Sequence, residues 1–368
     1  MNVLHLDLGR EWRGGQQQVL YLSAGLTVRG HRSVIATPAG SPLAGRAKAR
    51  DLPVIELSTG PPRLLRNVRE LRRLLDPGDF EILHAHTAHA HTVGQVARRL
   101  LPGGGRRPHF VVSRRVDFAP GGGPANRWKY LAGDAQFICV SHGVRRIMER
   151  FGVEPGRLRV VHSGVEVPDP RPSTEEERRA LRAEVRLPVE GLLLGQIGQL
   201  VPHKGQTHLI DAFAPLAEEF PQCHLAIFGD GPLRTELAAR IGSGPLRRRV
   251  SLLGYVNEAR RFLRAFDLYV SSSVEEGLGT SILDAGAHGL PVVATTAGGS
   301  AETVAPGETG YLVPPGDPTA LGQALRALLR DPALRRQMGE AGRLWVAARF
   351  SHESMVEGTI ACYRELRG

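Results

Sequence analysis

The sequence has little cysteine, almost no lysine and no long apolar run, and the first and last of these shortages exclude classes of protein. Its 368 residues include three cysteines, Cys139, Cys223 and Cys362, which argues against a disulfide framework and favours free thiols in a reducing compartment. No stretch approaches the roughly 18 consecutive apolar residues of a membrane-spanning helix. The N-terminal residues lack the basic and apolar segments of a secretory signal. We therefore expect a soluble, cytoplasmic protein.

The basic residues are almost all arginine, and they are unevenly distributed. Lys48, Lys129 and Lys204 are the only lysines among 47 basic residues, and the formal net charge is +10. Residues 1–170 contain 25 Lys and Arg against 14 Asp and Glu, so the basic excess lies in the first half of the chain. Such an excess favours an anionic substrate or surface. A GC-rich genome, which raises the use of arginine, is an equally good explanation.

Short apolar runs alternate with helical patterns along the whole chain. Runs such as NVLHLDL and FEILHAH predict strands, and segments such as GQQQVLYLSAGLTVRG predict helices between them, which is typical of parallel α/β sheets. The proline-rich segment Pro168–Pro172 predicts a linker. We therefore expect two doubly wound domains, residues 1–168 and 173–350, and a helix over about 351–368. Ligands of such sheets bind outside the carboxyl ends of the strands, and two facing domains would form a cleft.

The segment EEGLGTSILDAGAHGLPVV, which begins at Glu275, predicts a strand-to-helix turn that binds an anion. Its glycines allow the backbone to approach a ligand closely. The free N–H groups at the start of the helix, Thr280–Ile282, favour a phosphate group because the helix dipole is positive there.

Two acids, Glu276 and Asp284, flank this turn and suit a different group. Carboxylates accept hydrogen bonds from vicinal hydroxyls, and sugars present such pairs. A ligand with both phosphate and hydroxyl groups is a nucleotide sugar. Two simpler interpretations remain, in which Asp284 forms a capping box with Ser281 and Glu276 is a solvated loop acid.

The longer run EEGLGTSILDAGAHGLPVVATTAGGSAETV resembles the signature of the family 4 retaining glycosyltransferases, and the resemblance extends through nearly the whole chain. It implies the GT-B fold, with two Rossmann-like domains facing across a cleft and a C-terminal helix, about 351–368, crossing back to the first. It implies that residues 1–168 bind the acceptor and residues 173–350 bind the donor. It places Glu276 near the transferred sugar and Asp284 at the ribose, although the family has the longer Glu at the second position.

The segment GQIGQLVPHKGQ contains a second candidate for phosphate binding. Lys204 offers a compact point charge that suits a diphosphate, although it would also serve as an ordinary surface lysine. The resemblance implies an Arg and a Lys that together neutralise the leaving diphosphate. Gln199 stands where the family has Arg, so more of this task falls on Lys204 and the helix N-termini. Arg114 or Arg115 is a candidate to compensate.

Further donor contacts follow from the resemblance. They comprise Gly14, Gly15, Gly229, Gly231, Tyr255, Gly277, Leu278, Gly279, Thr280 and Ser281, with Gly298, Gly299 and Glu302 in a loop below the donor. Gly229 and Gly231 have a simpler interpretation as structural turn residues. The segment around Gly14 and Gly15 is not the G-x-G-x-x-G pattern of dinucleotide-binding proteins, which disfavours a nicotinamide oxidoreductase.

The histidine-rich segment HAHTAHAH contains His84, His86, His89 and His91. Zinc needs three or four converging ligands, and no acid or cysteine is close in sequence, so polar lining at the end of a strand is favoured over a metal site or a packed structural role. The family needs no metal, and the sequence has no D-x-D motif at a strand end. Arg114, Arg115 and Asp117, which follow the next strand, suit a phosphorylated acceptor or the diphosphate, or form a solvated turn.

The segment PRLLRNVRELRRLLD predicts an amphipathic helix. Its apolar face comprises Leu64, Val68, Leu71 and Leu75, and its arginines are Arg63, Arg66, Arg69, Arg72 and Arg73. Burial of the apolar face in the core is the simpler interpretation. Docking on an anionic membrane is the alternative, because acceptors in this family are often lipid-linked.

Together these features predict a retaining, metal-independent glycosyltransferase of the hexosyltransferase type that uses no cofactor. The expected donor is a UDP-sugar rather than a GDP- or ADP-sugar. The expected acceptor is a glycan or a lipid-linked glycan of lipopolysaccharide or another envelope polymer, and we expect no nucleic-acid partner. The protein would work in the cytoplasm, on the inner face of the plasma membrane. A UDP-sugar 2-epimerase and a non-catalytic sugar-nucleotide-binding relative are the alternatives.

Overall fold

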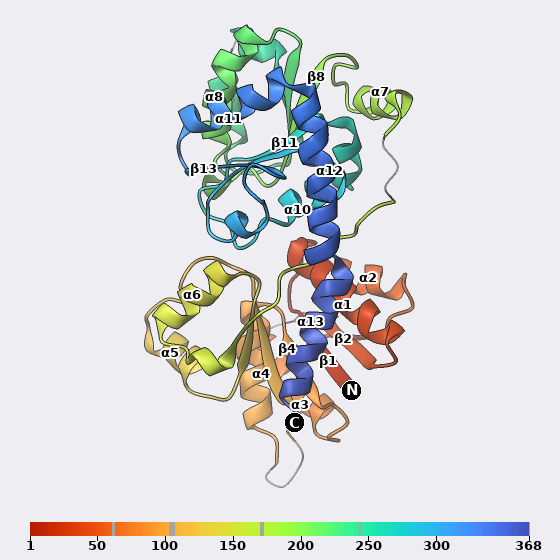
Figure 1. Ribbon diagram of the computed structural model, residues 1–368. Coiled ribbons are helices and arrows are strands. Elements are labelled where there is room, and N and C mark those ends of the chain that lie inside the picture. Colours follow the sequence, from red (N-terminus) through yellow and green to blue (C-terminus); the bar gives the residue numbers. More distant parts are fainter. Residues whose placement is uncertain (61–62, 103–106, 170–172, 243, 368) are drawn as a thin grey trace. The chain divides into compact units, whose positions relative to one another are not determined.

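The computed structural model describes residues 1–60, 63–102, 107–169, 173–242 and 244–367 (Figure 1). The chain divides into two compact units, Met1–Gly164 with His352–Gly368, and Val165–Ser351. Within the predicted linker Pro168–Pro172, residues 170–172 lie outside the described residues.

The first unit contains a seven-stranded parallel sheet in the order β3-β2-β1-β4-β5-β6-β7. Its strands are β1 (Asn2–Leu6), β2 (Arg32–Pro38), β3 (Val54–Leu57), β4 (Ile82–Ala85), β5 (His109–Arg114), β6 (Gln136–Cys139) and β7 (Leu158–Val160). Its helices are α1 (Gly14–Val28), α2 (Pro42–Lys48), α3 (Arg63–Leu75), α4 (Ala88–Arg99), α5 (Pro124–Leu131), α6 (His142–Phe151), the 3₁₀ turn η1 (Pro155–Arg157) and α13 (His352–Glu365).

The C-terminal helix α13 packs on the sheet of the first unit beside α1, as expected from the sequence (Figure 1). Its buried side chains Val356, Ile360 and Tyr363 contact Leu22 and Leu26 of α1 in one apolar cluster. Burying each of these side chains contributes about 1.5–3 kcal/mol, so the last helix is an integral part of the first unit.

The second unit contains a six-stranded parallel sheet in the order β10-β9-β8-β11-β12-β13. Its strands are β8 (Leu192–Ile197), β9 (Cys223–Phe228), β10 (Val250–Gly254), β11 (Leu268–Ser271), β12 (Val292–Thr295) and β13 (Gly310–Val313). Its helices are α7 (Glu175–Glu184), α8 (Gln206–Glu219), α9 (Arg234–Ile241), α10 (Thr280–Ala287), α11 (Pro318–Arg330) and α12 (Pro332–Arg349). Its 3₁₀ turns are η2 (Pro202–Lys204), η3 (Pro245–Arg248), η4 (Ala259–Ala265) and η5 (Ser300–Glu302).

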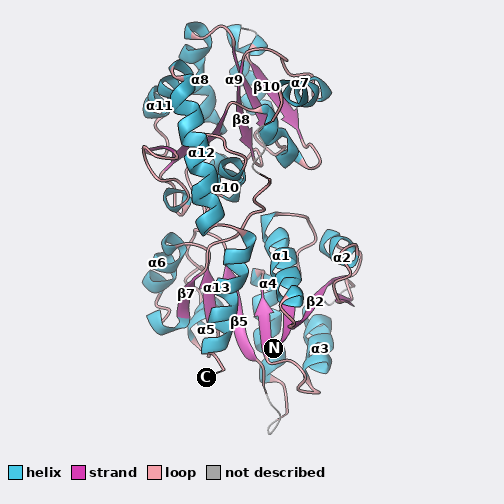
Figure 2. Cartoon of the chain, turned by 45° about the vertical axis from the view of Figure 1, so that its right-hand side comes forward, coloured by secondary structure: helices cyan, strands magenta, loops and turns pink. Residues whose placement is uncertain are grey.

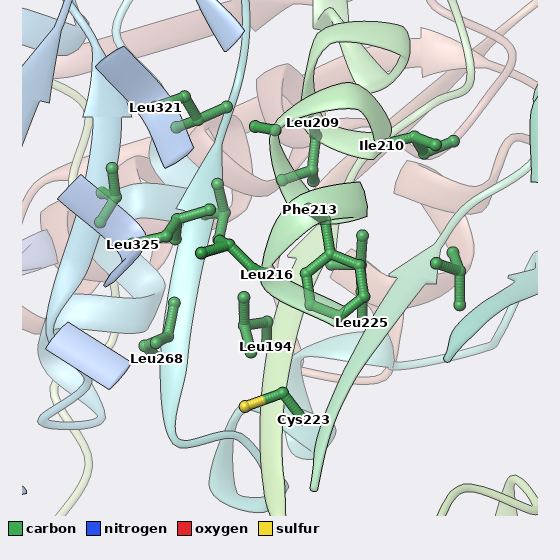
Figure 3. Close-up of a cluster of buried hydrophobic side chains, with 14 of the residues drawn as sticks. Leu194, Leu209, Ile210, Phe213, Leu216, Cys223, Leu225, Leu268, Leu321 and Leu325 are labelled. Carbon is green, nitrogen blue, oxygen red and sulfur yellow. The ribbon is translucent and has the colours of Figure 1, made fainter. Parts of the chain in front are cut away.

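The core of the second unit explains why its alternating apolar pattern folds this way. Figure 3 shows Phe213 and Leu216 of α8 above Leu194 and Leu225 of the neighbouring strands, with Leu325 of α11 beside them. All five side chains are fully buried. Strands that are apolar on both faces and helices that are apolar on one face give a sheet covered on both sides, which Figure 2 shows in each unit.

The two sheets share one topology. In each, the strand order reverses between the first and the fourth strand, β1 and β4 in one and β8 and β11 in the other. Because all strands of a sheet run parallel, the loops after them gather at one edge, and the reversal opens a crevice there. None of the described helices is both long and apolar enough to cross a bilayer.

Candidate functional site

The loop after β11 contains the predicted catalytic acid Glu276. Two backbone hydrogen bonds fix this loop: Gly299 N–H donates to the Glu276 carbonyl at 2.8 Å, and Val274 N–H donates to the His203 carbonyl at 2.8 Å. The second bond ties the loop after β11 to the loop after β8, its neighbour in the sheet. The loops on either side of the strand reversal therefore form one structure.

Lys204, at the end of η2, forms an ion pair with Glu276 through Nζ and Oε2. The Ser273 hydroxyl donates to the same carboxylate oxygen at 3.3 Å, and the Ser272 hydroxyl donates to the Lys204 carbonyl at 3.0 Å. The side chains of Lys204 and Glu276 remain 22% and 15% exposed, so a ligand can reach both. The two residues predicted to be catalytic are thus in direct contact although 72 positions separate them.

The N-terminus of α10 forms the anion-binding turn. Gly279 is its N-cap and adopts a left-handed backbone (φ 86°), a conformation that disfavours residues with a Cβ. The first helical hydrogen bonds are donated by Ile282 and Leu283 to the Gly279 carbonyl. Within the described residues, the N–H groups of Thr280 and Ser281 have no protein acceptor, which leaves them available to a phosphate. Gly277 and Leu278, just before this turn, are buried.

Asp284 lies on α10, one turn further along, and is buried. Its Oδ2 forms an ion pair with Arg260, 2.9 Å from Nε. Burial raises the pKa of Asp284 to about 6, and the Arg260 charge opposes this rise. The N-cap of α10 is Gly279, and no side chain caps the helix, so the capping-box interpretation with Ser281 is wrong. Sequence reasoning did not find Arg260, because no motif marks it.

The loops after β8, β9 and β10 complete this edge of the sheet. Gly229 has φ 139°, and a Cβ on it would collide with the Gly198 carbonyl oxygen. A Cβ on Gly231 would likewise collide with the Leu200 carbonyl oxygen, so both glycines let the loop after β9 pack against the loop that contains Gln199. The side chain of Gln199 is exposed, as is Tyr255, which is 77% exposed after β10. Gly298, beside Glu276, makes a similarly close backbone approach.

The carboxyl edge of the first unit holds a buried histidine cluster. His5 and His84 are register partners on β1 and β4, and His86 follows β4. His5 Nδ1 lies 3.0 Å from His86 Nε2, and both guanidinium NH2 groups of Arg115 lie 3.4 Å from His86 Nδ1. His84 contacts the Tyr363 hydroxyl of α13 at 2.5 Å. Sequence reasoning found His84, His86 and Arg115 but missed His5, which the β1–β4 pairing alone brings in.

This histidine cluster is uncharged. Burial, with the positive charge of Arg115, lowers the pKa of His5 to about 3 and holds the pKa values of His84 and His86 well below the usual range. Burial also lowers the pKa of Arg115 to about 10, and nearby Asp7 opposes this shift. Nitrogen atoms of the three histidines are close enough to share a cation. The guanidinium beside His86 disfavours a metal ion by charge repulsion, so the cluster suits hydrogen bonding to an anionic or hydroxylated ligand better.

Most of the other residues predicted for the first domain lie away from this cluster. Arg114 is buried and donates to the Phe118 carbonyl and the Tyr130 hydroxyl, and Asp117 lies near it. His91 of α4 packs among the rings of Phe110, Tyr130 and Phe137, whereas His89 is exposed. Gly14 and Gly15 are the first residues of α1, and Gly15 lies beside Arg115, since a Cβ on it would be 4.0 Å from Arg115 Cδ. The HAHTAHAH segment is therefore divided between the strand end and the helix.

Helix α3 buries part of its predicted apolar face. Val68, Leu71 and Leu75 are buried, which supports the simpler interpretation of this segment, whereas Leu64 and Leu65 remain 43% and 69% exposed. The exposed surface around them contains the arginines Arg63, Arg66, Arg69, Arg72 and Arg73.

Comparison with known proteins agrees with this fold. The model of the family described as "Glycosyltransferase Family 4" matches residues 12–168, and the model of the family described as "Glycosyl transferases group 1" matches residues 177–345. The lipopolysaccharide core biosynthesis glycosyltransferase LpsE of Rhizobium meliloti (strain 1021) is 26% identical over 361 residues, which cover 97% of each chain. The phosphatidyl-myo-inositol mannosyltransferase of Mycobacterium leprae (strain TN) is 32% identical over 282 residues, 74% of this chain and 70% of that chain. Anabaena Alr3699/HepE, solved in complex with UDP-glucose, has a TM-score of 0.86 at 22% identity, covering 99% of this chain and 100% of that chain.

The two doubly wound sheets, the returning C-terminal helix and this structural likeness define a GT-B fold. The chain belongs to the family 4, or group 1, glycosyltransferases. Its class of activity is therefore glycosyl transfer.

Proposed function

We propose that the protein transfers a sugar from a UDP-sugar to a glycan or lipid-linked acceptor, with retention of anomeric configuration and without a metal ion. The Lys204–Glu276 ion pair beside the free N–H groups of α10 is the observation that supports this most strongly. It combines a cation, a carboxylate and an anion-binding turn at the carboxyl edge of one sheet. The Anabaena structure with bound UDP-glucose supports the choice of uridine, and the naming of the relatives as transferases favours transfer over epimerisation.

The donor occupies the second unit in this proposal. Lys204 Nζ and the N–H groups of Thr280 and Ser281 bind the diphosphate and stabilise the negative charge that develops as it leaves. These groups supply positive charge without a metal. Glu276, released from Lys204 when the diphosphate binds, accepts hydrogen bonds from the transferred sugar, and Asp284 accepts one from the ribose.

Gly14 and Gly15 of the first unit add backbone contacts to the donor phosphate or the acceptor in this proposal. Gln199 contributes hydrogen bonds but no charge. The leaving group is therefore stabilised by a single side-chain cation of the second unit, Lys204, together with the dipole of α10.

The acceptor occupies the first unit. His86 and Arg115, at the end of the sheet, bind its hydroxyl or phosphate groups, with His84 supporting them from beneath. In this proposal the protein binds the anionic inner face of the plasma membrane through the basic surface of α3, and the exposure of Leu64 and Leu65 among arginines supports this. Co-sedimentation with vesicles should increase with anionic lipid content, and equal binding to neutral vesicles would contradict this.

A product assay tests the proposed function. The protein is incubated with UDP-glucose, UDP-galactose and UDP-N-acetylglucosamine and a panel of envelope-derived acceptors, and products are identified by mass spectrometry and their anomeric configuration by NMR. The expected result is a new glycoside with the configuration of the donor. Inverted product would refute retention, and epimerised nucleotide sugar without any glycoside would replace transfer with epimerisation.

A further inference from the structure

Arg260 contacts the acid at which this chain departs from its family, and nothing in the sequence marks it. It lies on η4 and forms an ion pair with Asp284, with Nε 2.9 Å from Oδ2. The arginine side chain is 39% exposed and the aspartate side chain 8% exposed, so the guanidinium reaches from the surface to a carboxylate at the base of the site. An ion pair between a partly exposed arginine and a buried carboxylate restricts the carboxylate to one orientation.

The surroundings of Asp284 leave Arg260 as its main electrostatic support. Glu166, from the segment that opens the second unit, disfavours ionisation of Asp284. Tyr269 of β11 faces the same region with its hydroxyl near Ser281, and His288 donates from Nδ1 to the Asp284 backbone carbonyl at 2.7 Å, away from the carboxylate. The cation that favours the ionised carboxylate is therefore Arg260.

The geometry also gives the two oxygen atoms of the Asp284 carboxylate different roles. Arg260 binds Oδ2, which leaves Oδ1 to accept a hydrogen bond from a ligand. Aspartate is one methylene shorter than glutamate, so its side chain is less flexible and its free oxygen can reach a hydroxyl in fewer positions. Holding one oxygen fixed therefore matters more for Asp284 than it would for a longer acid.

We propose that Arg260 is a positioning residue for nucleotide binding, which keeps Asp284 ionised and directs its free oxygen to a ribose hydroxyl of the donor. This inference deepens the proposed function and rests on it. Arg260 acts through Asp284 and need not touch the donor.

The inference predicts a pH signature that a purely structural role would not give. With Arg260 present, burial sets the pKa of Asp284 at about 6. Loss of the arginine removes the contribution that lowers this pKa, so the pKa rises further. Donor affinity that depends on the carboxylate is lost as pH falls through this pKa, and the loss begins at higher pH without Arg260.

The test is calorimetric titration of UDP-glucose into the full-length protein between pH 5.5 and 8.5. UDP-glucose is used because the terminal phosphate of free UDP itself titrates near pH 6. In Arg260→Gln we expect the midpoint of the pH dependence to rise by about one unit or more, which makes binding about threefold weaker or more at pH 6.5 and closer to wild type at pH 8.5. Arg260→Lys should restore most of the wild-type midpoint, because it keeps the charge.

Three controls separate this role from general damage to the fold. Arg261→Gln removes the neighbouring arginine, which pairs with Glu184 instead, and should leave the midpoint unchanged. Asp284→Asn should bind UDP-glucose weakly at every pH, with no midpoint in its pH dependence. Wild-type protein should behave in the same way toward the 2′,3′-dideoxyribose analogue of UDP-glucose. An Arg260→Gln midpoint equal to that of wild type, or an equal shift in Arg261→Gln, would overturn the inference. Failure of wild-type protein to bind UDP-glucose at any pH would instead refute the proposed donor, and the ribose role with it.

Discussion

The two units share one strand order but place opposite chemistry at the same edge of their sheets. The edge of the second unit has the ion pairs Lys204–Glu276 and Arg260–Asp284, together with a helix N-terminus that has free N–H groups. The edge of the first unit has neutral histidines beside one half-buried guanidinium. The fold therefore provides two equivalent edges, and the residues at each edge decide which ligand groups it can bind.

The largest effect should come from the cation of the second unit. Lys204→Ala removes the side-chain charge that stabilises the leaving diphosphate, and kcat should fall by roughly 10²–10³. Steady-state transfer assays with saturating acceptor measure this. Lys48→Ala, which removes a lysine of the first unit that pairs with Glu56, is the matched control and should leave kcat unchanged. Near-normal turnover in Lys204→Ala would refute its role.

The stability of the second unit should also depend strongly on the close approach of its loops. Gly229→Ala places a Cβ against the Gly198 carbonyl at a φ of 139°, which should cost about 3 kcal/mol of unfolding free energy. Gly316→Ala is the control, because its φ is also positive, at 74°, but nothing lies within 4 Å of the added Cβ. It should cost about 1 kcal/mol, and urea denaturation distinguishes the two. Equal costs would show that backbone conformation rather than loop contact sets the requirement.

Acidification should destabilise the first unit more than the second. The pKa values of His5, His84 and His86 are lowered in the folded state, so their stabilisation is present above pH 6.5 and is lost as pH falls below it. The raised pKa of Asp7 offsets part of this loss. In the second unit the lowered pKa of His224 gives a smaller loss, and Asp284 opposes it, because the raised pKa of Asp284 makes its neutral form favour folding as pH falls through about 6.

Hydrogen exchange, corrected for the intrinsic effect of pH, measures both trends in peptides from β1 and β4 and from β8 and β11. Protection should decrease more in the first pair than in the second. Asp284→Asn should change the trend of the second unit alone. An equal loss in both units would contradict the comparison.

The smallest effect should come from the contact between α13 and the histidine cluster. Tyr363→Phe removes the hydroxyl that contacts His84 Nδ1 and should destabilise the first unit by about 1 kcal/mol. Tyr311→Phe, in the second unit, is the control and should change stability by less. Thermal unfolding monitored by circular dichroism provides the comparison.

Local pattern in the sequence was enough to predict two parallel sheets and the turn at Gly279, and the family resemblance implied the returning helix. It could not supply the contacts that depend on strand order. His5 joins His84 only because β1 pairs with β4, and Arg260 reaches Asp284 only because η4 packs beside α10. Neither pair has a characteristic spacing.

The direction in which the side chains at a strand end point could not be predicted from the sequence either. Arg114 and Arg115 are adjacent in sequence, yet Arg114 is bound to Phe118 and Tyr130 while Arg115 faces His86. Successive side chains of a strand point to opposite faces, so only the register of β5 decides which arginine reaches the site.

The most direct test of the central claim is a crystal structure of the protein with UDP-glucose bound. The account predicts that the diphosphate lies against Lys204 Nζ and the N–H groups of Thr280 and Ser281, that the Lys204–Glu276 contact is broken, and that Asp284 accepts a hydrogen bond from a ribose hydroxyl. A nucleotide bound elsewhere, with the Lys204–Glu276 pair intact, would contradict it.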